Sequence, residues 1–119
     1  MAKYALMLPH RPDRYQGLSE DEYMNIIKDY IAWVEDMSAK GIYQGGHKLT
    51  DHPGKSLTAN GSGIEVHDIP AVEITELLGG LMVIEAGGWD EAINIARTCP
   101  HLIHNERIEI REIDAATED

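Results

Sequence analysis

The alternation of apolar and polar positions predicts that strands and helices are interleaved along the chain. From Gly79 onward, an apolar run over residues 81–86 is broken by two glycines, and a helical pattern follows from Trp89 until Pro100. The segment from Arg107 to Arg111 then alternates charged and apolar residues, as a strand with one buried face does. This strand–helix–strand unit, ending near Ile113, is the clearest element of the sequence.

A long first helix is predicted over about residues 20–40. Ser19 and Glu22 have the spacing of a capping box, and Gly41 follows as a natural C-terminal cap. Apolar residues then recur at intervals of three and four, which forms one apolar stripe on the helix. The stripe consists of Tyr23, Ile27, Tyr30, Val34 and Met37.

The remaining segments predict short strands and turns. Residues 4–8 form an apolar run that ends at Pro9, typical of a central strand. Residues 42–49 predict a strand in which Gly45 and Gly46 indicate a bulge or close packing. Residues 56–59 and 64–67 flank a glycine-rich hairpin turn.

Two stretches give weaker patterns. Pro70 blocks a regular central strand, so residues 72–78 are interpreted either as a helical turn or as an extended link. Residues 115–119 are expected to form a frayed polar tail.

This order predicts one domain over residues 1–119, with a ferredoxin-like α+β sandwich in which both helices cover one face of a four- or five-stranded sheet. The other face then needs a cover. A second copy of the chain is the commonest solution, so a homodimer is expected.

Composition limits the classes of partner. The chain has 21 acidic and 10 basic residues and a formal net charge of −11, which argues against nucleic acid and against an anionic membrane surface. Cys99 is the single cysteine, so no intrachain disulfide forms, as expected in a reducing compartment. No apolar run approaches the roughly 20 residues of a membrane helix, and the N-terminal segment is too short for a signal-peptide core. A cytoplasmic protein is expected.

The segment from Asp68 to Gly80, which reads DIPAVEITELLGG, resembles the motif of the YCII-related, or DGPF, domain family, roughly D-G-P-F-A-E-(T/S)-K-E-x-(L/I)-G-G. The glycine pair before the hairpin, the Cys-Pro-His-Leu turn and the final I-E-I-R strand agree with that family. Ile69, Ala71, Ile74 and Thr75 depart from the motif, so the chain is similar to a divergent member. The matching positions are Asp68, Pro70, Glu73, Glu76, Gly79 and Gly80.

The resemblance implies a ferredoxin-like fold paired into a dimeric α+β barrel, without a settled activity. A related branch carries a histidine–aspartate pair proposed as catalytic, but this chain lacks a histidine early in the first helix and has Cys99 and Pro100 near the expected aspartate. Neither role is carried over. Some members are encoded beside sigma factors, which suggests a regulatory role by analogy only.

Several residues invite a chemical role but favour a structural one. His101 and His104 lack the glutamate of a helical metalloprotease motif, so no metal and no cofactor are expected. Cys99 at a helix C-terminus would have a raised pKa, the wrong direction for a nucleophile. Glu73 and Glu76 could form an acid–base pair, but the favoured interpretation is that they are solvated surface groups or helix caps.

The candidate ligand site lies on the sheet face away from the helices, since the helix-covered face offers mainly core residues. Polar groups are expected to converge there beneath a partner subunit, either as a ligand pocket or as an interface salt-bridge set. These residues are His10, Arg11, His47, Glu109 and Arg111.

These patterns, together with what the family resemblance implies, lead to three candidate functions. The first is a homodimeric module that binds a small molecule or acts as an accessory protein. The second is a cofactor-independent acid–base enzyme of lyase or dehalogenase type, and the third is a regulatory partner of a sigma factor. A cleft that holds His10 or His47 favours the first two, whereas a filled barrel favours the third.

Overall fold

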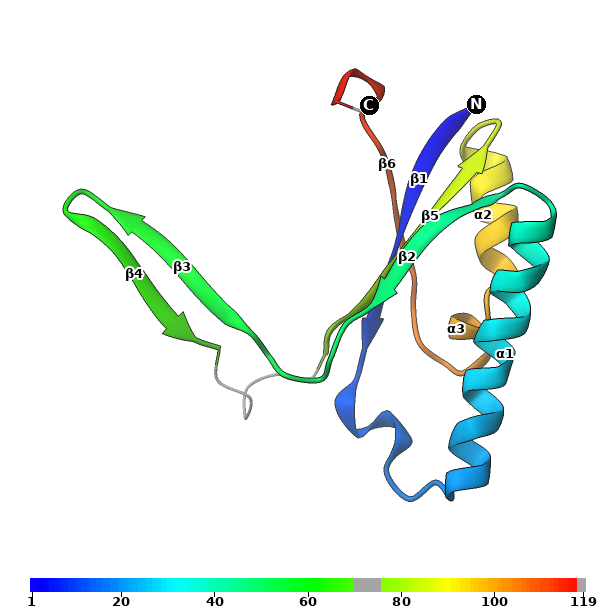
Figure 1. Cartoon of the computed structure of the whole chain (residues 1–119), viewed down its shortest axis with the longest axis horizontal. Coiled ribbons are helices and arrows are strands. Elements are labelled where there is room, and N and C mark those ends of the chain that lie inside the picture. Colours follow the sequence, from blue (N-terminus) through cyan, green and yellow to red (C-terminus); the bar gives the residue numbers. More distant parts are fainter. Residues whose placement is uncertain (70–75, 118–119) are drawn as a thin grey trace.

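The computed structural model describes residues 1–69 and 76–117, and the chain alternates strands with helices (Figure 1). Two short 3-10 helices, Pro12–Tyr15 and Ala115–Thr117, follow the first and the last strand. The other elements are β1 (Ala2–His10), α1 (Glu20–Ala39), β2 (Tyr43–Lys48), β3 (Lys55–Asn60), β4 (Gly63–Asp68), β5 (Leu77–Ala86), α2 (Trp89–Arg97), α3 (Pro100–Ile103) and β6 (Glu109–Glu112).

Four strands form the main sheet in the order β2-β5-β1-β6, and every neighbouring pair is antiparallel. The central strand β1 pairs along its whole length with β5 and over Tyr4 to Met7 with β6. The register places Leu6 between Met82 and Ile110. This confirms the predicted α+β class, in which helices accompany an antiparallel sheet.

Alternate side chains of the two central strands build the core against the helices. Leu6 and Ile84 are fully buried, and α1 adds Trp33 and Met37 to the same cluster. Burying each large apolar side chain stabilises the fold by roughly 1.5–3 kcal/mol. Both long helices cover the same face of the sheet, as predicted (Figure 1).

The start of α1 confirms the predicted capping box. The Ser19 hydroxyl accepts from the amide of Glu22 at 3.1 Å, and the Glu22 carboxylate accepts from the amide of Ser19 at 3.2 Å. Beyond the other end, Gly41 has a φ of 74°, the left-handed conformation that glycine adopts at low cost. The predicted helix is therefore correct to within one residue at its C-terminal end.

The glycine pair in β2 produces the predicted bulge. The register against β5 shifts between Tyr43 and Gly45, where Gly45 has a φ of 125°. At Gly46 an added Cβ would lie 2.7 Å from the carbonyl oxygen of Leu81, so this position accepts no side chain. The glycine at position 46 thus leaves room for the backbone of β5.

The region around Pro100 differs from the prediction. The helix α2 ends at Arg97, and Pro100 starts α3 rather than only stopping a helix. Cys99 is the N-cap of α3, and burial of its thiol, not a helix C-terminus, raises its pKa to about 11. The predicted direction is right, but its stated cause is wrong.

The strands β3 and β4 form a separate two-stranded sheet, which stands away from the body on the side opposite the helices (Figure 1). Every residue of both strands is exposed. This confirms the predicted hairpin. The prediction for residues 72–78 falls partly outside the described residues, because β5 begins at Leu77 and residues 70–75 are not described.

The frayed tail over residues 115–119 stays a prediction. Ala115–Thr117 forms a short 3-10 turn, in which the amide of Ala116 donates to the carboxylate of Asp114 at 2.9 Å. Residues 118 and 119 lie outside the described part. Over residues 1–69 and 76–117, no helix is long and apolar enough to cross a membrane.

Candidate functional site

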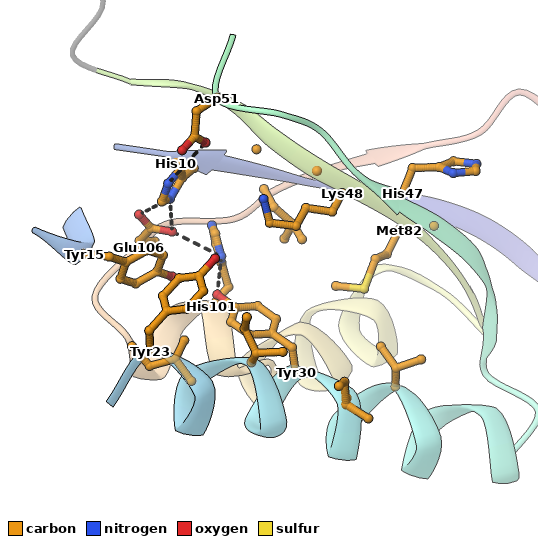
Figure 2. A pocket seen from close by; sticks show the side chains of 18 of the residues that line it. His10, Tyr15, Tyr23, Tyr30, His47, Lys48, Asp51, Met82, His101 and Glu106 are labelled. Carbon is orange, nitrogen blue, oxygen red and sulfur yellow. Dashed lines mark hydrogen bonds and ion pairs between the residues drawn. The ribbon is translucent and has the colours of Figure 1, made fainter. Parts of the chain in front are cut away.

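A cavity of about 420 Å³ lies between residues 23–34 of α1 and the sheet, within the size range of small-molecule sites. Its helix wall is the apolar stripe of α1 without Met37, extended by Ile26 and Ile31. Its sheet wall includes Leu8, Tyr43 and Met82. Polar side chains gather at the end formed by His10, Tyr15, Asp51, His101 and Glu106 (Figure 2).

Glycines leave room for this cavity on the sheet side. Gly80 lies between Leu8 and Lys48 in the register, and Gly46 lies opposite Met82. These positions carry no side chain that would extend toward α1. The glycines of the sheet therefore leave space opposite the large side chains of the helix wall.

Glu106 is the buried centre of the polar end. Its side chain is 2% exposed, and its Oε1 accepts from His10 Nδ1 at 2.8 Å and from the amide of Arg11 at 3.2 Å. Its Oε2 lies 3.5 Å from His101 Nδ1. A buried carboxylate is costly unless it is hydrogen-bonded, so the two hydrogen bonds to Oε1 hold Glu106 in place.

The chain places Glu106 by a turn at the end of α3. Asn105 has a φ of 62°, a left-handed conformation that asparagine tolerates, and the amide of Glu106 donates to the carbonyl of His101 at 3.0 Å. The Arg14 guanidinium donates to the carbonyl of His104 at 2.8 Å and ties this turn to the segment after β1. Residues far apart in sequence thus meet at one end of α1.

His101 is held as a neutral imidazole. Its Nε2 lies 2.7 Å from the carbonyl oxygen of Pro9, which only accepts, so Nε2 carries the proton. Burial lowers the pKa of His101, despite the opposing effects of that carbonyl and of Glu106. Its Nδ1 then accepts from the hydroxyl of Tyr30 at 2.8 Å.

His10 has the opposite tautomer. Because its Nδ1 donates to the Glu106 carboxylate, its Nε2 has a free lone pair when the ring is neutral. Asp51 Oδ1 lies 3.9 Å from this Nε2. The arrangement of carboxylate, imidazole and free nitrogen is the one that orients a histidine as a general base.

Tyrosines surround the two histidines. The ring of Tyr15 lies 5.2 Å from that of His10, and Tyr23 contacts Tyr15 edge-to-face with centroids 5.5 Å apart. Burial is the main cause that raises the pKa of Tyr15 and of Tyr30. Both phenols therefore stay protonated near neutral pH and act as hydrogen-bonding groups.

Neighbouring residues of β2 point in opposite directions. Figure 2 shows the Lys48 side chain running into the cavity toward its polar end, while the imidazole of His47 points away. The Lys48 ammonium donates to the carbonyl of Leu49 at 3.4 Å. Among the described residues, no carboxylate lies within ion-pair distance of this ammonium.

The structure does not bring the five predicted site residues together. His10 lines the cavity, and Arg11 contributes only its backbone amide. His47 is among the residues that border the cavity, but its imidazole points away from it (Figure 2). Glu109 and Arg111 lie opposite Met7 and Ala5 on the other sheet face. The expectation that the helix-covered face is only a core is corrected, because the tyrosines of α1 surround a cavity there.

The family-motif residues have structural contacts. Asp68 accepts from Lys55 at 2.5 Å across the hairpin, and Glu76 accepts from Arg107 at 2.6 Å, which lowers the pKa of Glu76. Gly79 accepts no side chain, because an added Cβ would lie 2.5 Å from the Cβ of His10. Gly80 belongs to the cavity wall. Pro70 and Glu73 lie outside the described residues. The hypothesis that Glu73 and Glu76 form an acid–base pair therefore stays untested.

Sequence reasoning missed Glu106, Asp51 and Lys48 and assigned Tyr30 to the core. No spacing rule joins a carboxylate at position 106 to a histidine at position 10. The one available signal was the presence of Tyr23 and Tyr30 on the apolar stripe, since buried tyrosines need polar partners. Within residues 1–69 and 76–117, no group of three or more His, Cys, Asp or Glu side chains is placed to hold a metal ion.

Comparisons with known proteins agree with this fold. No curated protein matches the chain significantly. The 5-chloro-2-hydroxyhydroquinone dehydrochlorinase of Burkholderia phenoliruptrix AC1100, solved in complex with 2,5-dihydroxybenzoquinone, has a similar structure with a TM-score of 0.51 and 14% identity, covering 96% of this chain and 94% of that one. Residues 2–115 match the YCII-related domain. Since that match spans nearly the whole sequence, the chain belongs to the family of YCII-related domain proteins.

Proposed function

We propose that this protein binds a small organic molecule in the cavity and transfers a proton from it with His10 as general base, without a cofactor. The observation that carries the proposal is the buried Glu106 carboxylate, 2.8 Å from His10 Nδ1 at the wall of a mostly apolar cavity. The carboxylate fixes the tautomer that leaves His10 Nε2 basic. A cleft that contains His10 favours ligand binding over a purely regulatory partner surface.

The proposed step is a proton abstraction followed by elimination. His10 Nε2 takes a proton from a carbon of the substrate, and the electron pair of the broken C–H bond forms a new double bond as a leaving group departs with its own bonding pair. Glu106 stabilises the resulting imidazolium, as the carboxylate does in a catalytic triad. The similar structure is named a dehydrochlorinase, which is compatible with this lyase type.

Hydrogen–deuterium exchange tests the base. A panel of single-ring carbonyl and hydroxyaryl compounds, including 2,5-dihydroxybenzoquinone, is incubated with the protein in D₂O and followed by proton NMR. We expect enzyme-dependent exchange of at least one C–H proton, and a loss of roughly 10²-fold or more in the His10→Gln variant.

The matched control is His47→Gln, because His47 lies on β2 at the border of the cavity but its ring points away from the cavity. We expect this variant to exchange protons as fast as the wild type. Exchange that is absent throughout the panel, or that is lost in His47→Gln and kept in His10→Gln, would contradict the proposal.

We also propose that the sheet has the ferredoxin-like arrangement and that two copies pair into a dimeric α+β barrel. The strand order and the position of both helices on one face support the first part. The exposed hairpin supports the second, because Leu57, Ile64 and Val66 are 64%, 69% and 61% exposed on one of its faces. An isolated two-stranded hairpin is only marginally stable in water, so this apolar face needs a cover.

Light scattering tests the dimer. We expect twice the monomer mass at micromolar concentration, and a shift toward monomer in the double variant Leu57→Ser/Val66→Ser. The control is the double variant Thr58→Ser/Glu65→Gln on the polar face of the same hairpin. A wild-type protein that is monomeric under these conditions rules out the dimer.

A further inference from the structure

We infer that the ligand of the cavity is a neutral weak acid of single-ring size, a phenol or an enol, that gives its acidic proton to His10 as it binds. This inference rests on the proposed role of His10 as a base, and it names the class of compound that the cavity accepts. It follows from the separation of polar and apolar walls and from the charges that face the cavity.

The cavity has one polar end and one apolar end. Figure 2 shows His10, Asp51 and Glu106 at one end and Met82 toward the other. The α1 wall and the sheet wall between these ends consist mainly of Ile, Leu, Val, Met and Tyr side chains. This division fits a molecule with a polar group at one end and an apolar ring as its body.

The charges at the polar end disfavour a permanently anionic ligand. Asp51 and Glu106 are carboxylates, and the whole chain has a formal net charge of −11, so a permanent anion is repelled as it approaches. The net charge does not repel a permanent cation, but such a ligand meets the ammonium of Lys48, which reaches toward this end (Figure 2). A neutral molecule enters without the repulsion that an anion meets.

An acidic hydroxyl is the neutral group that the polar end can use. When the ligand O–H donates to His10 Nε2, the O–H bond breaks, its electron pair stays on the ligand oxygen, and an N–H bond forms on His10. The imidazolium then faces Glu106 at Nδ1 and Asp51 at Nε2, at distances of 2.8 Å and 3.9 Å. Both carboxylates therefore stabilise the product of the transfer.

Lys48 completes the arrangement, since an oxyanion needs a donor. Its ammonium enters the cavity and, among the described residues, pairs with no carboxylate, so it can donate to the oxygen that has lost its proton. The total charge of cavity and ligand is the same before and after the transfer, because the proton moves only from the ligand to His10. A weak acid can therefore enter the cavity as a neutral molecule and be stabilised there after it has lost its proton.

The test uses 4-nitrophenol, whose phenolate absorbs visible light, at a pH where the free compound is mostly protonated. We expect the wild-type protein to bind it and to increase the phenolate absorbance, whereas His10→Gln binds it without the colour. In Lys48→Met the affinity should fall roughly tenfold, as expected for the loss of one charged hydrogen bond. Lys55→Met, which removes a hairpin lysine outside the cavity, should behave as the wild type.

Two comparison compounds complete the test. Benzoate, a permanent anion of similar size, should bind at least roughly tenfold more weakly than 4-nitrophenol, and nitrobenzene, which has no acidic proton, should also bind more weakly. Benzoate that binds as tightly as 4-nitrophenol, 4-nitrophenol that fails to bind, or bound 4-nitrophenol that stays protonated overturns the inference. Ionisation of 4-nitrophenol without any C–H exchange in the panel above rejects the enzyme but retains the ligand class.

Discussion

The two helices meet the same sheet face in different ways. Around α2, small residues allow direct contact, and Ala86, Ala92, Ala96 and Cys99 are buried. Around the N-terminal half of α1, Tyr23 and its neighbours on the stripe are only half-buried and border the cavity. An apolar helical stripe therefore does not specify a filled core. The size of its side chains, and the glycines opposite them, decide between packing and a binding site.

The largest expected effect distinguishes the packed region from the open one. Ile84→Ala removes a fully buried side chain, which typically lowers the free energy of unfolding by 2–5 kcal/mol. Ile27→Ala removes the same atoms from the cavity wall, where the side chain is half-buried, and should cost less than about half of that. Urea denaturation measures both. Equal losses would mean that the α1 region is packed as tightly as the α2 region.

A second prediction concerns the glycine that supports His10. In Gly79→Ala the new Cβ would lie 2.5 Å from the Cβ of His10 and 3.2 Å from the carbonyl of Leu8, so the strands must separate. We expect a loss of about 1–3 kcal/mol and a changed NMR environment of the His10 ring. The control Gly61→Ala, where nothing lies within 4 Å, should leave that environment unchanged.

The third prediction is that the free energy of unfolding falls as the pH is lowered. Burial lowers the pKa of His101 below its ordinary value of 6.5, so the unfolded chain binds this proton more tightly than the folded one. The contribution of His101 is complete above pH 6.5 and is lost as the pH falls toward the folded-state value. Urea titrations from pH 7 to pH 5 should show a shallower decline in His101→Gln than in the wild type. The exposed His52→Gln should keep the wild-type slope, and identical slopes in all three proteins would exclude His101 as the cause.

The last prediction concerns the reactivity of the Cys99 thiol, which lies in the packed region around α2. Burial raises the pKa of its thiol from 9.0 to about 11, so its thiolate fraction near neutral pH falls roughly a hundredfold. Iodoacetamide should label native Cys99 at least that much more slowly than the unfolded chain. An exposed thiol introduced by Ala39→Cys in a Cys99→Ala background is the matched control. Rapid labelling of the native wild type would show that the α2 region opens readily.

The sequence predicted the elements better than the site, for physical reasons. The capping box at Ser19, the stripe of α1, the bulge at Gly45 and the hairpin are local, because the interacting residues lie within a few positions of one another. The Glu106–His10 pair joins residues 96 positions apart, so only the folded sheet shows it. The direction of Glu109 and Arg111 was correctly inferred from strand alternation, but alternation does not reveal which face has a cavity.

The position of β1 at the centre of the sheet affects how the chain folds. This strand is synthesised before its partners β5 and β6, which begin at Leu77 and Glu109. A nascent chain therefore carries an unpaired apolar strand until most of the sequence has left the ribosome. Because contacts between distant residues must form before the sheet is stable, folding is expected to be slow relative to that of helical bundles of similar length. A newly made chain would depend on chaperones most during this interval.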